Sequence, residues 1–169
     1  MDVLMAPWRF TYIKIVDRMK GCVFCEAPRK SDEESLILAR GKYSYVIMNL
    51  YPYNTGHVMV VPYRHVADIV ELDERELSEM SYFIKISLKA LREVYRPHGF
   101  NIGVNLGRVA GAGIEEHVHI HIVPRWNGDT NFMPVIAGVK VVSQDVRESY
   151  KALKPVFDRL LREQPPGES

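Results

Sequence analysis

Three histidines, His117, His119 and His121, stand at every second position of this chain, and the residues between them are aliphatic. In a β-strand alternate residues share a face, so the pattern predicts three imidazoles on one side and aliphatic side chains facing a core. Neighbouring imidazoles would stand about 6.6 Å apart at Cα, and the outer pair about 13 Å apart. One metal ion cannot readily bind all three, so one end of the row can serve a structural site while the other two rings face a substrate.

The chemistry that such a row supports is attack on a phosphoryl group. Histidine has the unperturbed pKa nearest neutrality, so it can act as nucleophile, general acid or general base without a large shift. Neutral imidazole attacks phosphorus well, and the resulting phosphoramidate is labile enough for water or phosphate to clear it. The alternatives are an accidental alternation on a surface strand and a metal site of the His-x-His kind. Three histidines in register, between the glycine-rich segment 107–113 and Pro124, favour catalysis.

The run from His117 to Pro124 resembles the signature of the histidine triad family, whose members are nucleotide-binding hydrolases and transferases. The segment 53–62, in which Gly56 precedes His57, is similar to a second strand of that family. The resemblance covers residues 21–126. Four further motifs are similar to the branch that contains bacterial diadenosine tetraphosphate phosphorylases, namely Ala6–Arg9, Asn49–Asn54, Arg96–Asn101 and Pro124–Asp129.

The resemblance implies a role for each of five residues. His119 would be the nucleophile that forms a nucleotidyl-enzyme intermediate during cleavage of a dinucleoside polyphosphate such as diadenosine tetraphosphate. His121 would contact the phosphate and help the leaving group depart, and His57 would lie beside the row on the neighbouring strand. Asn49 would hold the ribose, and Asn105 would contact the phosphate region.

The segment before the triad departs from the family pattern. Hydrolase branches carry Gln or Ser shortly upstream of the first triad histidine, whereas this chain has only small residues from Ala110 to Gly113. We expect the backbone N–H groups of Gly111, Ala112 and Gly113 to cradle phosphate oxygens, since glycine permits close approach and positive φ. The vacated volume leaves room for inorganic phosphate as the acceptor, which favours phosphorolysis. Hydrolysis of dinucleoside polyphosphates or nucleoside phosphoramidates, and a nucleotide sensor with little turnover, remain alternatives.

The two cysteines of the chain, Cys22 and Cys25, have the spacing of a metal knuckle. Zinc in a structural site takes four nitrogen or sulfur ligands in a tetrahedron, so two more ligands are needed. The family resemblance implies that these are His65 and His117, and that the zinc is structural and closed to substrate. The alternative is a reduced, metal-free pair of thiols.

Five segments have the composition of strands and are bounded mostly by Gly, Pro or Asn: 35–39, 43–49, 57–62, 100–106 and 117–123. A long helix is expected after Asp73 as N-cap, with an apolar stripe that ends before Pro97. The stripe is formed by Leu77, Met80, Ile84, Leu88, Leu91 and Tyr95. A second helix is expected over 143–162. These elements predict an α+β domain on a five-stranded antiparallel sheet.

The length of 169 residues fits one domain, which we expect over 1–163 with a disordered tail over 164–169. The 22 Lys and Arg against 21 Asp and Glu give a formal net charge of +1. This balance excludes a global attraction to nucleic acid or anionic membranes. No apolar run has the length of a membrane span and no secretory signal is recognisable, so we expect a cytoplasmic protein. Its expected partners are a nucleotide, inorganic phosphate and, from the family, a second copy in a homodimer.

Overall fold

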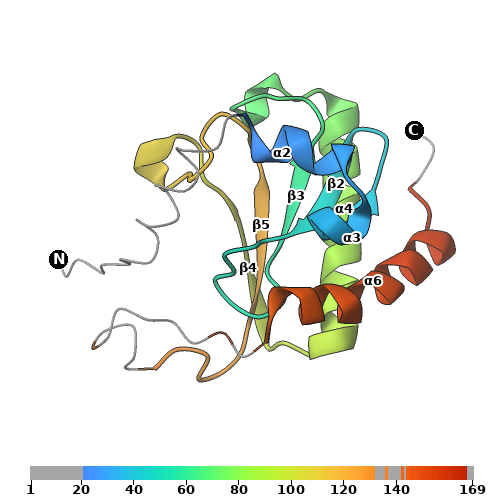
Figure 1. The fold of residues 1–169 in the computed structure, drawn as a ribbon, viewed down its shortest axis with the longest axis vertical. Coiled ribbons are helices and arrows are strands. Elements are labelled where there is room, and N and C mark those ends of the chain that lie inside the picture. Colours follow the sequence, from blue (N-terminus) through green and yellow to red (C-terminus); the bar gives the residue numbers. More distant parts are fainter. Residues whose placement is uncertain (1–20, 132–135, 137–141, 143, 167–169) are drawn as a thin grey trace.

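The computed structural model describes residues 21–131, 136, 142 and 144–166. Within them, five strands form one sheet in the order β1-β2-β3-β5-β4, and every neighbouring pair is antiparallel (Figure 1). The predicted fold class is therefore confirmed, and the strand ends differ from prediction by at most three residues. The strands are β1 (Ile37–Arg40), β2 (Ser44–Met48), β3 (Val58–Pro62), β4 (Gly99–Val104) and β5 (Ile120–Arg125).

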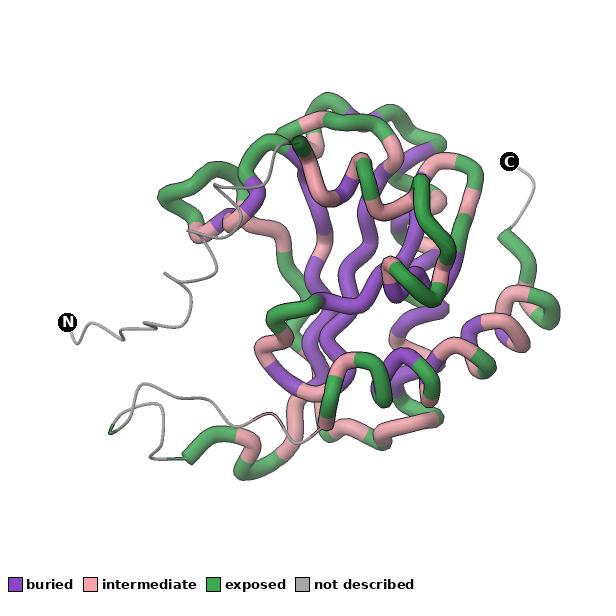
Figure 2. The backbone as a smooth tube through the Cα atoms, in the orientation of Figure 1, coloured by how far each residue is buried: buried purple, intermediate pink, exposed green. Residues whose placement is uncertain are grey.

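Two long helices, α4 (Glu74–Tyr95) and α6 (Val146–Glu163), pack against the sheet and against each other. Their buried side chains join those of the strands in the larger hydrophobic cluster of the protein. Figure 2 shows most of the sheet buried at the centre of the fold, while the edge strand β4 is partly exposed. The expected N-cap of the first helix is confirmed, because the Asp73 carboxylate accepts hydrogen bonds from the backbone N–H groups of Arg75 and Glu76. Among the described residues, no helix is long and apolar enough to cross a bilayer.

Only some residues of the apolar stripe predicted for α4 are buried. Met80 and Leu91 are buried as expected, but Leu77 is 36% exposed. Phe83 and Ile86, which lie outside the predicted stripe, are buried in the core instead. The reason is that α4 contacts both the sheet and α6, so it needs a wider apolar face than one stripe at spacings of three and four provides.

Several short helical segments connect the longer elements, and two of them overlap the polar segment 28–34 before β1. The side chain of Ser31 accepts a hydrogen bond from the backbone N–H of Glu34 and so begins a single turn there. The short segments are α2 (Val23–Glu26), η1 (Ala27–Arg29), α3 (Asp32–Ser35), η2 (Ile69–Glu71) and η3 (Arg108–Ala110). Such single turns have too few residues to show a helical periodicity in the sequence.

Gln164, the first residue after α6, is bonded to both long helices. It donates its backbone N–H to Leu160 O at 2.9 Å, and its own carbonyl accepts the Tyr82 hydroxyl at 2.7 Å. The Lys89 ammonium also contacts the Gln164 side chain. These contacts tie the end of α6 to α4. Residues 167–169, the motif Ala6–Arg9 and Ser143, the predicted start of the second helix, lie outside the described residues.

The hydroxyl of Ser87 provides a test of the core. Ser87 belongs to α4, and its buried hydroxyl oxygen has no hydrogen-bond partner among the described residues. A buried hydroxyl without a partner costs about 1–3 kcal/mol, and alanine also has the higher helix propensity. We therefore expect Ser87→Ala to raise the free energy of unfolding by about 1 kcal/mol in urea denaturation. A decrease in this free energy would show that the hydroxyl is satisfied.

Candidate active site and metal centre

The histidines occupy the face of the sheet opposite α4 and α6. Val118 and Ile122 belong to the cluster beneath those helices, which confirms that the aliphatic residues of the row face the core. His121 lies opposite Met59 in the β3–β5 register, and Met59 belongs to a second, smaller cluster that includes Phe24 of α2. Strand β5 begins at Ile120, so the first two triad histidines precede it rather than lie within it.

The imidazoles form a continuous row. The ring centroids of His119 and His121 are 4.7 Å apart, and those of His121 and His57 are 5.1 Å apart. Phe24 contacts both of the first two triad histidines, with its centroid 5.5 Å from His117 and 4.8 Å from His119. His57 and His117 are fully buried, whereas His119 and His121 keep 6% and 9% of their surface exposed. The structure thus brings together the four histidines that the sequence selected for this face.

The protonation state of His119 follows from one hydrogen bond. Its Nδ1 lies 2.8 Å from the backbone carbonyl oxygen of His117. A carbonyl can only accept, so Nδ1 carries the proton, and in the neutral ring Nε2 carries the lone pair. Burial lowers the pKa of His119, although the bond to the carbonyl opposes that shift. Both observations favour a neutral imidazole with its lone pair on Nε2.

A second chain of hydrogen bonds sets the tautomer of His121. The backbone N–H of Tyr53 donates to His57 Nδ1 at 3.0 Å, so the proton of neutral His57 is on Nε2. That Nε2 lies 2.9 Å from His121 Nδ1 and donates to it. His121 therefore accepts at Nδ1 and carries its own proton on Nε2. The two neighbouring rings are complementary, since His119 offers a lone pair at Nε2 and His121 offers an N–H.

The two predicted nucleoside-contacting amides occupy different settings. Asn49 follows β2 and is buried; its Oδ1 accepts the backbone N–H of Tyr51 at 2.8 Å, and its Nδ2 lies 3.4 Å from His57 Nδ1. Asn105 follows β4 and is half-buried. The β4–β5 ladder ends at the pair of Val104 and Ile120, so Asn105 and His119 are the next residues beyond its end. Asn49, in contrast, contacts His57.

The glycine-rich loop uses two of the three N–H groups expected to hold phosphate. Gly111 donates to Arg108 O at 2.9 Å, and Ala112 donates to Gly107 O at 3.3 Å. Gly111 ends η3 with φ +96°, a conformation that favours glycine. A phosphate group can therefore use the N–H groups of Gly111 and Ala112 only if this turn opens. Among the described residues, no backbone carbonyl accepts a hydrogen bond from the Gly113 N–H.

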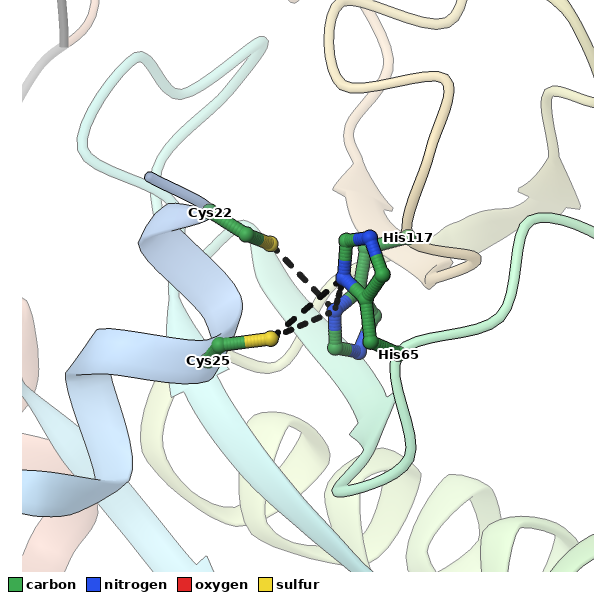
Figure 3. Close-up of side chains that lie close together, drawn as sticks. All are labelled: Cys22, Cys25, His65 and His117. Atoms are coloured by element: carbon green, nitrogen blue, oxygen red, sulfur yellow. Dashed lines mark hydrogen bonds between the residues drawn. The ribbon is translucent and has the colours of Figure 1, made fainter. Parts of the chain in front are cut away.

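At the other end of the row, four side chains converge from three segments of the chain (Figure 3). The thiols of Cys22 and Cys25 extend from α2 toward the imidazoles of His65 and His117. His117 Nε2 donates to Pro62 O at 2.8 Å, so its lone pair is on Nδ1, the atom that faces the cluster. A hydrogen bond of this kind to the outer ring nitrogen is the usual support of a metal-binding histidine.

The distances in this cluster fit a tetrahedral zinc site. Usual zinc–ligand bond lengths require about 3.4 Å between two nitrogen ligands and about 3.5 Å between nitrogen and sulfur. His117 Nδ1 lies 3.3 Å from Cys22 Sγ, 3.6 Å from Cys25 Sγ and 3.3 Å from His65 Nδ1. Cys25 Sγ is 3.4 Å from His65 Nδ1, and all four ligand atoms lie within 4.8 Å of one another. The four side chains are therefore already arranged as the ligands of one metal ion.

Burial raises the pKa of the Cys22 thiol to about 11. Without a metal this thiol is protonated at neutral pH, and metal binding must release its proton, because zinc binds the thiolate. Burial thus disfavours a free thiolate at Cys22.

The loop that carries His65 is fixed from two sides. The backbone N–H of Val118 donates to Val66 O at 2.7 Å, which joins the loop to the histidine row. Arg64 forms a bidentate ion pair with Glu76, with both N–O distances at 2.7 Å. The Arg64 hydrogen bond holds the pKa of the buried Glu76 carboxyl below its usual range. These contacts attach the loop to the first turn of α4.

Sequence reasoning missed Tyr53, Phe24 and Arg64. Tyr53 acts through its backbone N–H, which no side-chain pattern reveals. Phe24 did carry a signal, because a residue between two metal-ligand candidates must lie close to the metal site. Arg64 directly precedes His65 in the chain, but its partner Glu76 is identifiable only from the fold.

Comparison with known proteins adds three findings. The sequence model of the HIT domain matches residues 30–128. A protein of Mycobacterium tuberculosis named AP-4-A phosphorylase is 49% identical over 136 residues, which cover 80% of this chain and 70% of that protein. A bis(5'-nucleosyl)-tetraphosphatase [asymmetrical] of Schizosaccharomyces pombe is 34% identical over 95 residues, 56% of this chain and 52% of that protein.

A similar solved structure is that of a Zn-bound histidine triad family protein from Mycobacterium smegmatis. It superposes with a TM-score of 0.67 at 25% sequence identity, over 85% of this chain and 98% of that one. The similarity therefore extends well beyond the segment 30–128 that the HIT model matches.

Proposed function

This chain belongs to the HIT domain family, and on that premise we propose that it cleaves diadenosine tetraphosphate by phosphorolysis through a nucleotidyl intermediate on His119. The observation that carries the proposal is the bond from His119 Nδ1–H to the His117 carbonyl, which leaves the lone pair on Nε2. Nε2 attacks the phosphorus next to one adenosine, a P–N bond forms, and the P–O bond to the remaining ATP breaks. The attached imidazole is cationic, and the His117 carbonyl stabilises its Nδ1–H.

His121 assists departure of ATP in this mechanism. Its Nε2–H donates to the phosphate oxygen that gains negative charge as the P–O bond breaks. His57 holds His121 in the required tautomer, and the Tyr53 N–H in turn holds His57. Asn49 and Asn105 are proposed to contact the ribose and the phosphate region, and Gly111, Ala112 and Gly113 to lie beside the acceptor.

Inorganic phosphate then attacks the nucleotidyl group, the P–N bond breaks, and ADP leaves while His119 regains its lone pair. Two observations support phosphate as the acceptor. The segment before the triad has only small side chains, and a relative with 49% identity is named AP-4-A phosphorylase. Hydrolysis is the second candidate, because a tetraphosphatase is also among the relatives.

The proposal includes one structural zinc ion held by Cys22, Cys25, His65 and His117, for which the four ligand distances fit. When bound, zinc supplies a closed tetrahedral cross-link between α2, the loop after β3 and the segment before β5. A homodimer in the cytoplasm, with no nucleic acid or membrane partner, completes the proposal.

The products of diadenosine tetraphosphate cleavage test the acceptor. We expect ADP and ATP in equal amounts when inorganic phosphate is present, and less than about a tenth of that rate without it, since the intermediate then lacks its acceptor. Separation of the nucleotides by ion-exchange chromatography measures both. AMP with ATP at a rate independent of phosphate would establish hydrolysis. Tight nucleotide binding without turnover would instead indicate a sensor.

A further inference from the structure

Phe24 touches both functional ends of the histidine row. It lies between the two cysteines in the sequence, and only 4% of its surface is exposed. Its ring packs edge-on against the metal-ligand candidate His117, with an interplanar angle of 64°, and tilted against the nucleophile His119, with an angle of 46°. Phe24 is therefore in contact with the metal cluster and with the proposed reacting residue at once.

The position of the Phe24 ring depends on how α2 is held. A helix of four residues is not stable by itself. The two cysteines on either side of Phe24 reach histidines of other segments, at 3.3 Å from Cys22 Sγ to His117 Nδ1 and 3.4 Å from Cys25 Sγ to His65 Nδ1. The Tyr45 hydroxyl also holds this turn, since it donates to Phe24 O at 2.7 Å. Among the described residues, the two cysteine contacts therefore tie α2 to the metal cluster.

The His119 ring needs a second constraint besides its single hydrogen bond. The bond from Nδ1–H to the His117 carbonyl fixes one atom of the ring but permits the ring plane to tilt about that atom. The Phe24 ring covers one side at a centroid distance of 4.8 Å, and the His121 ring stands edge-on at 4.7 Å. These two neighbours fix the direction in which Nε2 points, and misplacement of a reacting atom by about 1 Å costs about 10²-fold in rate.

We propose that Phe24 is a positioning residue that couples closure of the metal cluster to the orientation of the His119 ring. Metal bound by Cys22 and Cys25 fixes the position of α2, and α2 in turn fixes the position of the Phe24 ring. The ring then holds His119 in the orientation for attack. In its catalytic consequence this inference rests on the proposed function, whereas the structural link between Phe24 and His119 does not.

The kinetic test compares Phe24→Leu with the wild type, each loaded with zinc and each stripped by a chelator. Stripping is expected to slow formation of the nucleotidyl-enzyme in the wild type by about tenfold or more. Zinc-loaded Phe24→Leu is expected to show a similar loss, and stripping it should add less than about a twofold loss. Ile47→Val, which removes one methyl group from the same hydrophobic cluster, should keep the wild-type response to zinc. If stripping slows Phe24→Leu as much as the wild type, the coupling does not pass through Phe24.

A measurement of zinc affinity distinguishes the positioning role of Phe24 from a role in holding the metal. In competition with a chromogenic chelator, Phe24→Leu is expected to bind zinc within about threefold of the wild-type affinity, because Phe24 offers no ligand atom. A larger loss would make Phe24 part of the support of the metal site and would overturn the proposal.

A spectroscopic readout is independent of turnover. In protein labelled with ¹³C in the histidine rings, the His119 resonance is identified by its absence from His119→Gln. Zinc removal should shift it in the wild type, since the Phe24 ring current acts at 4.8 Å, and should shift it much less in Phe24→Leu. An unchanged His119 resonance in the stripped wild type sinks the coupling. Absence of any nucleotidyl-enzyme in the zinc-loaded wild type contradicts the proposed function. The His119 resonance then still tests the structural link between Phe24 and His119.

Discussion

His119→Ala is expected to abolish the nucleotidyl-enzyme and to lower turnover of diadenosine tetraphosphate by about 10³-fold or more. The variant lacks the Nε2 lone pair that the bond from Nδ1–H to the His117 carbonyl exposes in the wild type. None of the neighbouring rings replaces it, because the tautomer chain from the Tyr53 N–H places a proton on His121 Nε2. Mass spectrometry of protein denatured at alkaline pH, at which the P–N bond survives, measures the intermediate, and nucleotide chromatography measures turnover.

The matched control for this loss is His98→Asn. His98 is an exposed histidine at the turn before β4, and its Nδ1 accepts the backbone N–H of Asn127 at 2.9 Å. The amide oxygen of asparagine can accept the same bond, so this variant should keep turnover within about twofold. Thermal unfolding of His119→Ala checks that the variant still folds without the buried ring. Formation of a nucleotidyl-enzyme by a folded His119→Ala protein would remove His119 from the role of nucleophile.

Loss of the metal ligands is expected to have the largest effect on stability. Protein purified without added metal should contain one zinc per chain, and Cys22→Ser should contain much less, because serine is a poor zinc ligand. With free zinc at about 100 times the dissociation constant, binding stabilises the fold by about 2.7 kcal/mol. For a chain of this length, that loss lowers Tm by roughly 5 to 10 °C. Elemental analysis and calorimetry measure the two quantities.

A chelator distinguishes metal binding from simple packing of the thiol. In its presence the wild type and Cys22→Ser should unfold at the same temperature, since neither then has zinc. A persistent difference would mean that Cys22, which is half-buried, stabilises the fold through packing. An equal Tm for the two proteins both with and without chelator would show that this cluster holds no structural metal.

Much of the fold was predictable because its signals are local. Strand-like composition, with Gly, Pro or Asn at most of the boundaries, marked all five strands, and the side chain of Asp73 marked the start of α4 at the correct residue. The position of the core stripe on α4 was not predictable to the same degree. Whether Leu77 or Phe83 is buried depends on where α6 packs, and that is a contact between residues far apart in the sequence.

The sequence by itself determined which chemical groups are available. The alternation of His117, His119 and His121 gave them a common face, and the spacing of Cys22 and Cys25 marked one half of a ligand set. Both patterns are local, because a strand and a single helical turn fix the relative directions of residues two or three apart.

Only the tertiary structure decided what these groups can do. The protonated nitrogen of each histidine depends on a partner elsewhere: the His117 carbonyl for His119, the Pro62 carbonyl for His117, and the Tyr53 N–H acting through His57 for His121. The folded loop likewise showed that the N–H groups of Gly111 and Ala112 are already used. The physical reason is that an imidazole is nucleophile, ligand or acid according to which of its nitrogens is hydrogen-bonded, and folding supplies that bond.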